Sequence, residues 1–230
     1  MTVAMSLSSA QAKFVEQVVL AHRSINEPVV LGHLGHLFRV HPQVFSPFLA
    51  PSGRVGLSFA AWPIFPGKRV LDVGCGSGII TSLIALSGAS RVVGVDISPY
   101  AVANARANAA ALGIESLLEV RPGDLFGPIG RDEIYDIIFA DLPFTSGDPQ
   151  DDLERAFFDK DLDSIRRFIR DAPELLSRAP LTAKAYLCLS TLEPIELTLS
   201  ELNTHVSCTE VMRVSLEIMS LHLYELRLKR

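Results

Sequence analysis

The sequence predicts an α/β protein built on a doubly wound, mostly parallel sheet of about seven strands. Three observations lead to this fold class. From Arg69 onward, short apolar runs alternate with helical segments, which is the order of elements that a parallel sheet requires. The first apolar run, Val70–Val73, leads into a glycine-rich turn at Gly74–Gly78 that opens a helix. With 230 residues, 48% hydrophobic and 20% charged, the chain can fold around one large core.

The N-terminal part reads as a separate helical layer. Helices are expected over about 9–23, 28–38 and 53–62. Ser8 or Ser9 can cap the first of them, and Pro28 suits the first turn of the second. Between the second and third helices, repeated prolines up to Pro51 argue against helical structure, because each proline restrains the residue before it.

The remainder of the chain supplies the sheet and its covering helices. Strands are expected over 69–73, 91–95, 117–121, 135–140 and 183–190. Helices are expected over 77–87, 99–112, 161–176 and 194–202. The last two apolar runs, 208–215 and 221–227, are expected to pair as a closing antiparallel hairpin.

Composition and charge exclude several classes of protein. The net charge of −5 gives no strongly basic face for a phosphate backbone, so nucleic acid is not the expected partner. Cys75, Cys188 and Cys208 are far apart and include no C-x-x-C pair, which predicts buried thiols rather than disulfides or a metal site. No signal peptide and no apolar run of membrane-span length is found, so we expect a cytoplasmic protein without a membrane partner.

The glycine turn predicts a nucleotide-type ligand of a particular kind. Gly74-x-Gly76-x-Gly78 places its third glycine one residue earlier than the dinucleotide fingerprint does. Asp72, just before the turn, would repel a pyrophosphate but tolerate an amino or sulfonium group. Asp96 follows the last glycine by 18 residues, about where a carboxylate can accept hydrogen bonds from ribose hydroxyls. The alternative is a turn that only links a strand to a helix.

This pattern resembles the first motif of class I S-adenosylmethionine-dependent methyltransferases. The resemblance implies S-adenosylmethionine as the cofactor, with the turn residues Gly74, Cys75, Gly76 and Gly78 against its methionine part and ribose. Asp72 and Asp141 are also expected to contact the cofactor. It also implies that Asp96 holds the ribose diol. Residues 63–230 are then the S-adenosylmethionine-binding catalytic domain. We expect residues 1–62 to cover its open edge as a lid that helps to bind substrate, the alternative being a cap on the outer face of the sheet.

Four aspartates follow successive strands: Asp72, Asp96, Asp124 and Asp141. The carboxyl ends of parallel strands share one edge of a sheet, where ligands bind, so these side chains are expected to gather there. By the resemblance, Asp124 would accept a hydrogen bond from the adenine amino group, Leu125 would supply a backbone contact, and Ile97 would pack on the adenine face. An ordinary turn aspartate is the alternative for Asp124.

The segment Asp141-Leu142-Pro143-Phe144 is the candidate catalytic site. It resembles the Asn/Asp/Ser-Pro-Pro-Tyr/Phe/Trp motif of methyltransferases that act on nitrogen, with Leu142 in place of the first proline. The resemblance implies that the Asp141 side chain and the Leu142 carbonyl orient the acceptor nitrogen while Phe144 stacks on the acceptor. An ionised aspartate only accepts hydrogen bonds, so it suits an amine and could act as a base.

The closest resemblance is to the small-domain branch that includes release-factor glutamine and ribosomal RNA guanine N-methyltransferases. Three hypotheses follow. The first is methyl transfer to a nitrogen of a small molecule, amino acid or peptide, and the second is methylation of ribosomal RNA, the ribosome or a release factor. In the third, the protein consumes the cofactor itself by a cyclisation that releases methylthioadenosine. The sequence predicts neither the acceptor nor the oligomeric state.

Weaker candidates complete the predicted site. The substrate pocket is assigned three aromatic residues: Phe45, Phe48 and Tyr186. A core side chain is the alternative for Tyr186, which lies in the strand expected over 183–190. His33, His36 and His41 lie close together in the sequence, but no carboxylate or cysteine cluster accompanies them. They are therefore expected to be surface or packing side chains, and no metal site is expected.

Overall fold

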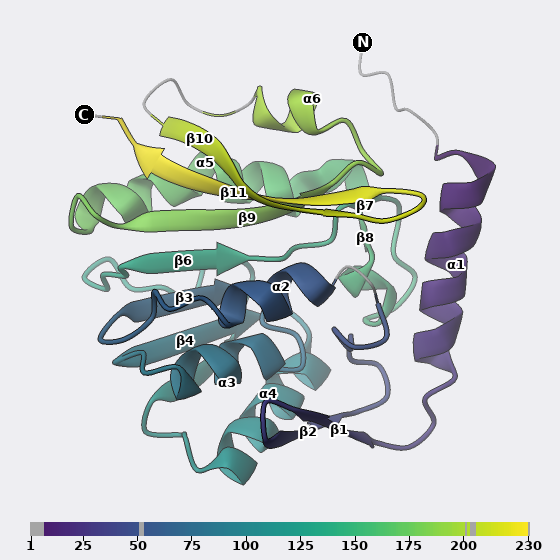
Figure 1. Ribbon diagram of the computed structural model, residues 1–230, viewed down its shortest axis with the longest axis horizontal. Coiled ribbons are helices and arrows are strands. Elements are labelled where there is room, and N and C mark those ends of the chain that lie inside the picture. The colour runs from purple at the N-terminus through teal and green to yellow at the C-terminus, as the bar shows by residue number, and fades with distance from the viewer. Residues whose placement is uncertain (1–6, 51–52, 201, 203–205, 230) are drawn as a thin grey trace.

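A sheet of seven strands forms the centre of the computed structural model, which describes residues 7–50, 53–200, 202 and 206–229 (Figure 1). The strand order is β10-β11-β9-β6-β3-β4-β5. The parallel strands are β3 (Arg69–Val73), β4 (Arg91–Asp96), β5 (Leu118–Pro122), β6 (Ile137–Ala140) and β9 (Lys184–Ser190). The antiparallel strands are β10 (Val206–Ser215) and β11 (Ser220–Leu228). The predicted doubly wound, mostly parallel sheet is confirmed.

Helices cover both faces of this sheet, and each face buries its own apolar cluster. One face carries α2 (Gly53–Ala60), α3 (Ile79–Leu86) and α4 (Pro99–Leu112), while the other carries α5 (Asp163–Arg178) and α6 (Ile195–Leu199). Successive residues of β3 point to opposite faces, so Val70 joins the first cluster and Leu71 the second. The last predicted helix ends at Leu199 rather than near 202, and residue 201 lies outside the described part of the chain.

The N-terminal region contains one large departure from the predicted elements. The first helix, α1 (Ser9–Arg23), is confirmed, and Ser8 caps it. The second predicted helix is wrong: its residues form an antiparallel hairpin of β1 (Val29–His33) and β2 (His36–Val40). Leu34 and Gly35 both have positive φ angles, 48° and 80°, as a two-residue hairpin turn requires. Valines at the strand ends and alternating burial along β2 favour this arrangement over a helix.

Two buried asparagines of α4 attach this hairpin to the sheet. The Asn108 side chain accepts a hydrogen bond from the Arg39 backbone at 2.8 Å and donates to the carbonyl of Ser77, in the glycine-rich turn, at 2.9 Å. Asn104 accepts one from the His41 backbone at 2.8 Å. The hairpin and the glycine-rich turn are therefore held by the same helix.

The segment 1–62 shares its core with the rest of the chain. Phe59 of α2 stacks on Phe139 of β6, with ring centroids 4.5 Å apart. Helix α2 thus lies on a sheet face, whereas α1 lies beyond the carboxyl ends of the strands (Figure 1). Residues 1–6, Pro51 and Ser52 of the predicted N-terminal layer lie outside the described part of the chain. No helix in the described ranges is both long and apolar enough to cross a membrane.

Candidate active site

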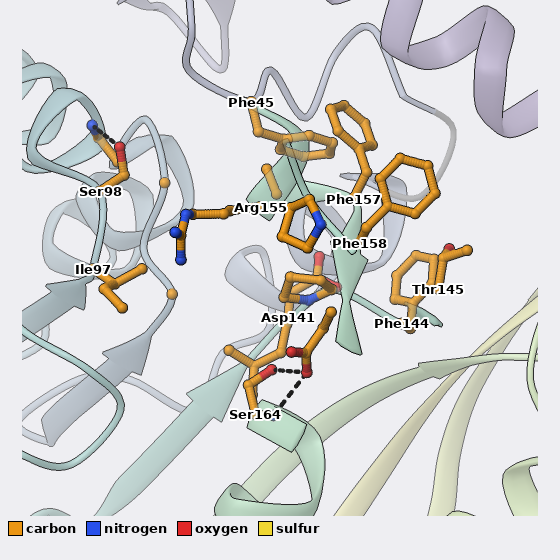
Figure 2. A pocket seen from close by; sticks show the side chains of 18 of the residues that line it. Phe45, Ile97, Ser98, Asp141, Phe144, Thr145, Arg155, Phe157, Phe158 and Ser164 are labelled. Atoms are coloured by element: carbon orange, nitrogen blue, oxygen red, sulfur yellow. Dashed lines mark hydrogen bonds between the residues drawn. The ribbon is translucent and has the colours of Figure 1, made fainter. Parts of the chain in front are cut away.

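A cavity of about 340 Å³ lies at the carboxyl edge of the sheet (Figure 2). One wall comes from the segments that follow the strands: Gly74, Gly76, Asp96, Ile97, Ser98, Gly123, Asp124, Leu125 and Asp141–Phe144. The opposite wall comes from α1, from the loop 43–45 and from a later part of the segment between β6 and α5. The structure therefore brings most of the predicted site residues together around one space.

The glycine-rich turn contributes only part of its length to this cavity. Gly74, Gly76 and Gly78 have φ angles of 78°, 54° and 74°, which favour glycine at all three positions. A Cβ atom at Gly76 would meet no atom within 4 Å, because that residue faces the open cavity. A Cβ atom at Gly78 would lie 2.6 Å from Cβ of Ala105, so this glycine allows α3 and α4 to pack closely. Gly78 and Cys75, both predicted to bind the cofactor, are not among the residues that line the cavity.

Asp96 connects the end of β4 to the glycine-rich turn. Its Oδ2 accepts a hydrogen bond from the Gly76 backbone at 2.8 Å, and its Oδ1 accepts one from the Ser98 backbone at 2.9 Å. Burial raises the pKa of the Asp96 carboxyl, and the backbone N–H groups oppose that rise. Its position in the cavity wall fits the predicted role toward ribose hydroxyls, which remains a proposal.

Asp72 lies beneath the turn rather than in the cavity wall. It is 2% exposed and accepts a hydrogen bond from the Thr81 hydroxyl. Burial is the main cause that raises the pKa of Asp72 to about 7. The expectation that Asp72 touches the cofactor directly does not fit this position.

The raised pKa of Asp72 predicts a pH-dependent stability. The folded state binds its proton more tightly than the unfolded state does, so the free energy of unfolding falls as the pH rises from about 4 to about 7. Asp72→Asn keeps an oxygen that accepts from Thr81 and removes the buried charge. Between pH 5 and pH 8, the free energy of unfolding is then expected to fall by about 2 kcal/mol less in Asp72→Asn than in wild type.

Urea unfolding at these two pH values measures the effect, with the exposed Asp132→Asn as the matched control. If the free energy of unfolding depends on pH in the same way in wild type and Asp72→Asn, the Asp72 carboxyl is not the cause of that dependence.

The segment after β6 places a carboxyl group at the floor of the cavity. Asp141 and the three residues that follow it, Leu142, Pro143 and Phe144, all line the cavity. Burial raises the pKa of Asp141 to about 6, although a hydrogen bond from the Cys188 thiol lowers it in part. Asp141 can therefore be ionised near neutral pH and still take up a proton.

Asp124 already has a partner in this structure. Its Oδ2 lies 2.6 Å from Nη2 of Arg167 on α5. Leu125, with a φ of 47°, and Ile97, which is 54% exposed, line the same part of the cavity. The predicted contact of Asp124 with an adenine amino group would therefore compete with an ion pair.

Two of the three predicted substrate-pocket residues lie elsewhere. Phe45 lines the cavity. Phe48 does not, and instead packs beside His33 at a ring distance of 5.4 Å. Tyr186 belongs to the buried core, where it lies 4.9 Å from the ring of Phe59 and donates a hydrogen bond to Glu225 at 2.8 Å. The inward face of β9 at this position is covered by α2, which excludes Tyr186 from the cavity.

Residues 145–162, called the strap from here on, are a part of the site that the sequence did not reveal. The strap contains β7 (Thr145–Ser146), a 3-10 turn (Glu154–Ala156), β8 (Phe158–Asp159) and a second 3-10 turn (Lys160–Leu162). It adds Asp152, Arg155, Phe157 and Phe158 to the cavity wall. In Figure 2 the side chain of Arg155 extends toward Ile97 and Ser98. Two adjacent phenylalanines within a charged loop are the signal that could have indicated this role.

Ion pairs attach the strap to α1. Nη2 of Arg23 lies 2.7 Å from Asp151 and 2.6 Å from Glu154. Both carboxylates belong to the strap, so these ion pairs link α1 to the strap, and side chains of both line the cavity. Because these groups are partly exposed, each pair contributes little to stability, and their main effect is to fix relative position.

The predicted helical spacing of His33 and His36 is not found in the structure. His33 and His36 face each other across the hairpin turn rather than along a helix, which corrects the predicted helical spacing. Within the described ranges, no three His, Cys, Asp or Glu side chains gather in a way that could hold a metal ion.

Comparison with known proteins identifies the family. Residues 64–215 match the methyltransferase domain family. A release factor glutamine methyltransferase of Cereibacter sphaeroides is 34% identical over 145 residues, which are 60% of this chain and 49% of that protein. A ribosomal RNA small subunit methyltransferase C of Chromohalobacter salexigens is 36% identical over 124 residues, which are 53% of this chain and 33% of that protein. The chain thus matches half or less of the length of these relatives.

The fold is also found among solved structures. A 16S rRNA methyltransferase of T. thermophilus, in complex with AdoMet and guanosine, superposes with a TM-score of 0.61. The alignment covers 89% of this chain and 50% of that one at 22% sequence identity, a level that shows the fold alone. Because the family match extends over more than half of the chain, the protein belongs to the methyltransferase domain family that its glycine-rich turn predicted.

Proposed function

We propose that this protein binds S-adenosylmethionine in the cavity at the sheet edge and transfers its methyl group to a nitrogen atom. One observation carries the proposal: the open glycine Gly76, the carboxylate of Asp96 and the segment Asp141–Phe144 line the same cavity. The first two match the cofactor half of the family pattern, and the third matches its acceptor half. Their convergence supports the binding of a methyl donor and an acceptor in one cavity.

The residues present fit the cofactor. Gly76 leaves room for a ligand against the backbone, and Asp96 offers carboxylate oxygens beside it. A volume of about 340 Å³ lies within the usual range of small-molecule sites. When bound, the cofactor supplies a methyl group on a sulfonium, whose sulfur is a good leaving group. Ile97 and Leu125 would pack against the adenine, and the Asp124–Arg167 pair borders that position.

The part of the cavity around Asp141–Phe144, called the acceptor half from here on, favours a nitrogen that carries hydrogen atoms. An ionised Asp141 only accepts hydrogen bonds, and the Leu142 carbonyl is an acceptor as well. Two acceptors next to each other can hold an N–H group so that its lone pair points to the methyl carbon. Asp141 can also receive the proton that the nitrogen loses, as its pKa of about 6 permits. Phe144 borders the same space and offers an aromatic ring to the acceptor.

A small molecule, amino acid or peptide is the acceptor class that we propose. By their names, the relatives act on a release factor and on ribosomal RNA. The cavity is lined by more carboxylates than guanidiniums: Asp96, Asp124, Asp141, Asp152, Asp159 and Asp163 against Arg155 and Arg167. Together with the net charge of −5, this does not favour a polyanion near the reacting atoms.

A second candidate function is that the cofactor itself is the substrate. The small volume and the cover formed by α1 and the strap favour it, because they leave limited room for a second molecule. In that case the amino group of the cofactor would attack its own side-chain carbon and release methylthioadenosine, with Asp141 taking the ammonium proton.

Incubation of the protein with S-adenosylmethionine alone, followed by mass spectrometry, separates the two candidates. A methyltransferase leaves the cofactor intact until an acceptor is added and then gives S-adenosylhomocysteine. Methylthioadenosine produced by wild type, and not by Asp141→Asn, would reject methyl transfer and support the second candidate.

A further inference from the structure

The acceptor half of the cavity is aromatic and apolar. Five phenylalanines line it, Phe14, Phe45, Phe144, Phe157 and Phe158, together with Val15, Val18, Val44, Leu192 and Met219. They come from α1, the loop before α2, the strap, and the segments after β6, β9 and β10. In Figure 2, Phe45, Phe144, Phe157 and Phe158 stand on the opposite side of Arg155 from Ile97 and Ser98. The apolar part is therefore distinct from the part assigned to adenine and ribose.

The aromatic wall of the acceptor half is held in place by contacts between rings and by the hydrogen bonds of His22. The rings of Phe45 and Phe157 meet edge to face at 5.5 Å, and the ring of His22 stacks on Phe45 at 5.2 Å. His22 is almost fully buried, with Nδ1 2.8 Å from the Val18 carbonyl and Nε2 accepting from the Ser46 backbone at 3.1 Å. Since both ring nitrogens are engaged, the imidazole is fixed and the wall is preorganised for a ligand.

Among the carboxyl groups of the described residues at this wall, Asp141 alone has neither a charged nor a backbone partner. The Asp159 carboxylate is occupied by the backbone N–H of Ser164 at 2.7 Å and by its hydroxyl at 2.6 Å. Within the part of the chain that the structure describes, the one hydrogen bond to Asp141 comes from the weakly donating thiol of Cys188. An apolar aromatic pocket with one such carboxylate is complementary to a cation with an apolar body, because the carboxylate and the aromatic faces both attract an ammonium group.

Helix α1 and the strap bound this part of the cavity. Phe14, Val15 and Val18 of α1 line it, as do Phe157 and Phe158 of the strap. Arg23 ties that helix to the strap. A compact acceptor therefore suits this part of the cavity better than a base of a folded RNA or a side chain of a large protein.

We propose that the acceptor is a small primary or secondary amine with an aromatic or branched apolar group. This rests on the proposed function and names its substrate class. Asp141 takes a proton from the bound ammonium and passes it to water. The neutral amine nitrogen then forms a bond to the methyl carbon as the carbon–sulfur bond breaks and its electron pair returns to sulfur, which leaves the methylated nitrogen as an ammonium. The products are the methylated amine and S-adenosylhomocysteine.

Binding of 2-phenylethylamine to the full chain saturated with S-adenosylhomocysteine tests this class without turnover. Calorimetry is expected to show saturable binding, and 3-phenylpropanoate, which carries a negative charge in place of the ammonium, should not bind. Phe157→Ala is expected to weaken amine binding about tenfold. Phe48→Ala, which removes a phenylalanine outside the cavity, is the matched control and should leave it unchanged.

Asp141→Asn provides a second test, which separates recognition of the ammonium charge from recognition of the ligand's shape. Its affinity for 2-phenylethylamine should fall about tenfold or more, whereas its affinity for the uncharged 2-phenylethanol should stay within about twofold of wild type. With S-adenosylmethionine present, mass spectrometry should find N-methyl-2-phenylethylamine.

Two results would overturn the inference. If S-adenosylhomocysteine binds but the amine neither binds nor is methylated, the acceptor class is wrong while the cofactor site stands. Methylation of a glutamine-containing peptide or an RNA fragment in the same assay would point to the acceptor classes of the relatives. If S-adenosylhomocysteine itself does not bind, the proposed function fails before the acceptor is in question.

Discussion

Asp141→Asn is expected to lower turnover about 100-fold or more while the affinity for S-adenosylmethionine stays within about threefold of wild type. The asparagine keeps the size of the side chain, but it cannot take a proton, and its NH2 group donates where the carboxylate accepts. Cofactor binding depends mainly on the other wall of the cavity, around Gly76 and Asp96. The loss should therefore appear in the chemical step.

The pH profile gives this prediction a definite sign. With a pKa of about 6, Asp141 is ionised above that pH and neutral below it. Wild-type kcat/KM is expected to rise as the pH increases through about 6, and Asp141→Asn should lose that limb of the profile. Steady-state rates between pH 5 and pH 8 measure it, with the exposed Asp148→Asn as control. Unchanged turnover in Asp141→Asn would remove this residue from the mechanism.

Asp96→Ala is expected to weaken S-adenosylmethionine binding about 100-fold. The substitution removes two hydrogen bonds to backbone N–H groups, those of Gly76 and Ser98, as well as the predicted contacts to ribose. Hydrogen bonds to a charged group contribute about 1.5–3 kcal/mol each, and the loss of one or two of them gives this magnitude. Asp96→Asn should fall between wild type and alanine, because its amide can still accept one of the two bonds.

Titration calorimetry with S-adenosylhomocysteine measures these affinities. Thermal unfolding of each variant separates a local loss of binding from a loss of fold, since the glycine-rich turn depends on Asp96 for its shape. A well-folded Asp96→Ala protein with wild-type affinity would place the cofactor elsewhere.

The sheet could be predicted from the sequence because its signals are local. Apolar runs of strand length, the glycine-rich turn and the Ser98–Pro99 start of α4 each lie within a few residues of one another. The same local reasoning failed at 28–38, where a proline and spaced apolar residues resembled a helix. The hairpin turn there depends on positive φ angles at Leu34 and Gly35. Leucine rarely adopts such a conformation, so the sequence does not predict the turn.

The site could be predicted only in outline. Chain order shows that Asp96, Asp124 and Asp141 reach one edge of the sheet, but not which of them is already paired, as Asp124 is with Arg167 of α5. Tyr186 and Phe48 are predicted pocket residues, but tertiary packing places both outside the cavity. The strap takes its position from ion pairs with Arg23, more than a hundred residues earlier in the chain, and such partners leave no periodic signal. The boundary at residues 62 and 63, the role of α1 as a lid and a cytoplasmic location stay predictions.

Titration of the wild-type protein with S-adenosylmethionine and S-adenosylhomocysteine tests the central claim most directly. One saturable site per chain is predicted for each ligand, and Asp96→Ala should abolish most of the signal at the same concentrations. Absence of a binding heat and of any thermal stabilisation with both ligands, in a folded wild-type protein, would contradict the assignment of the cavity as a cofactor site.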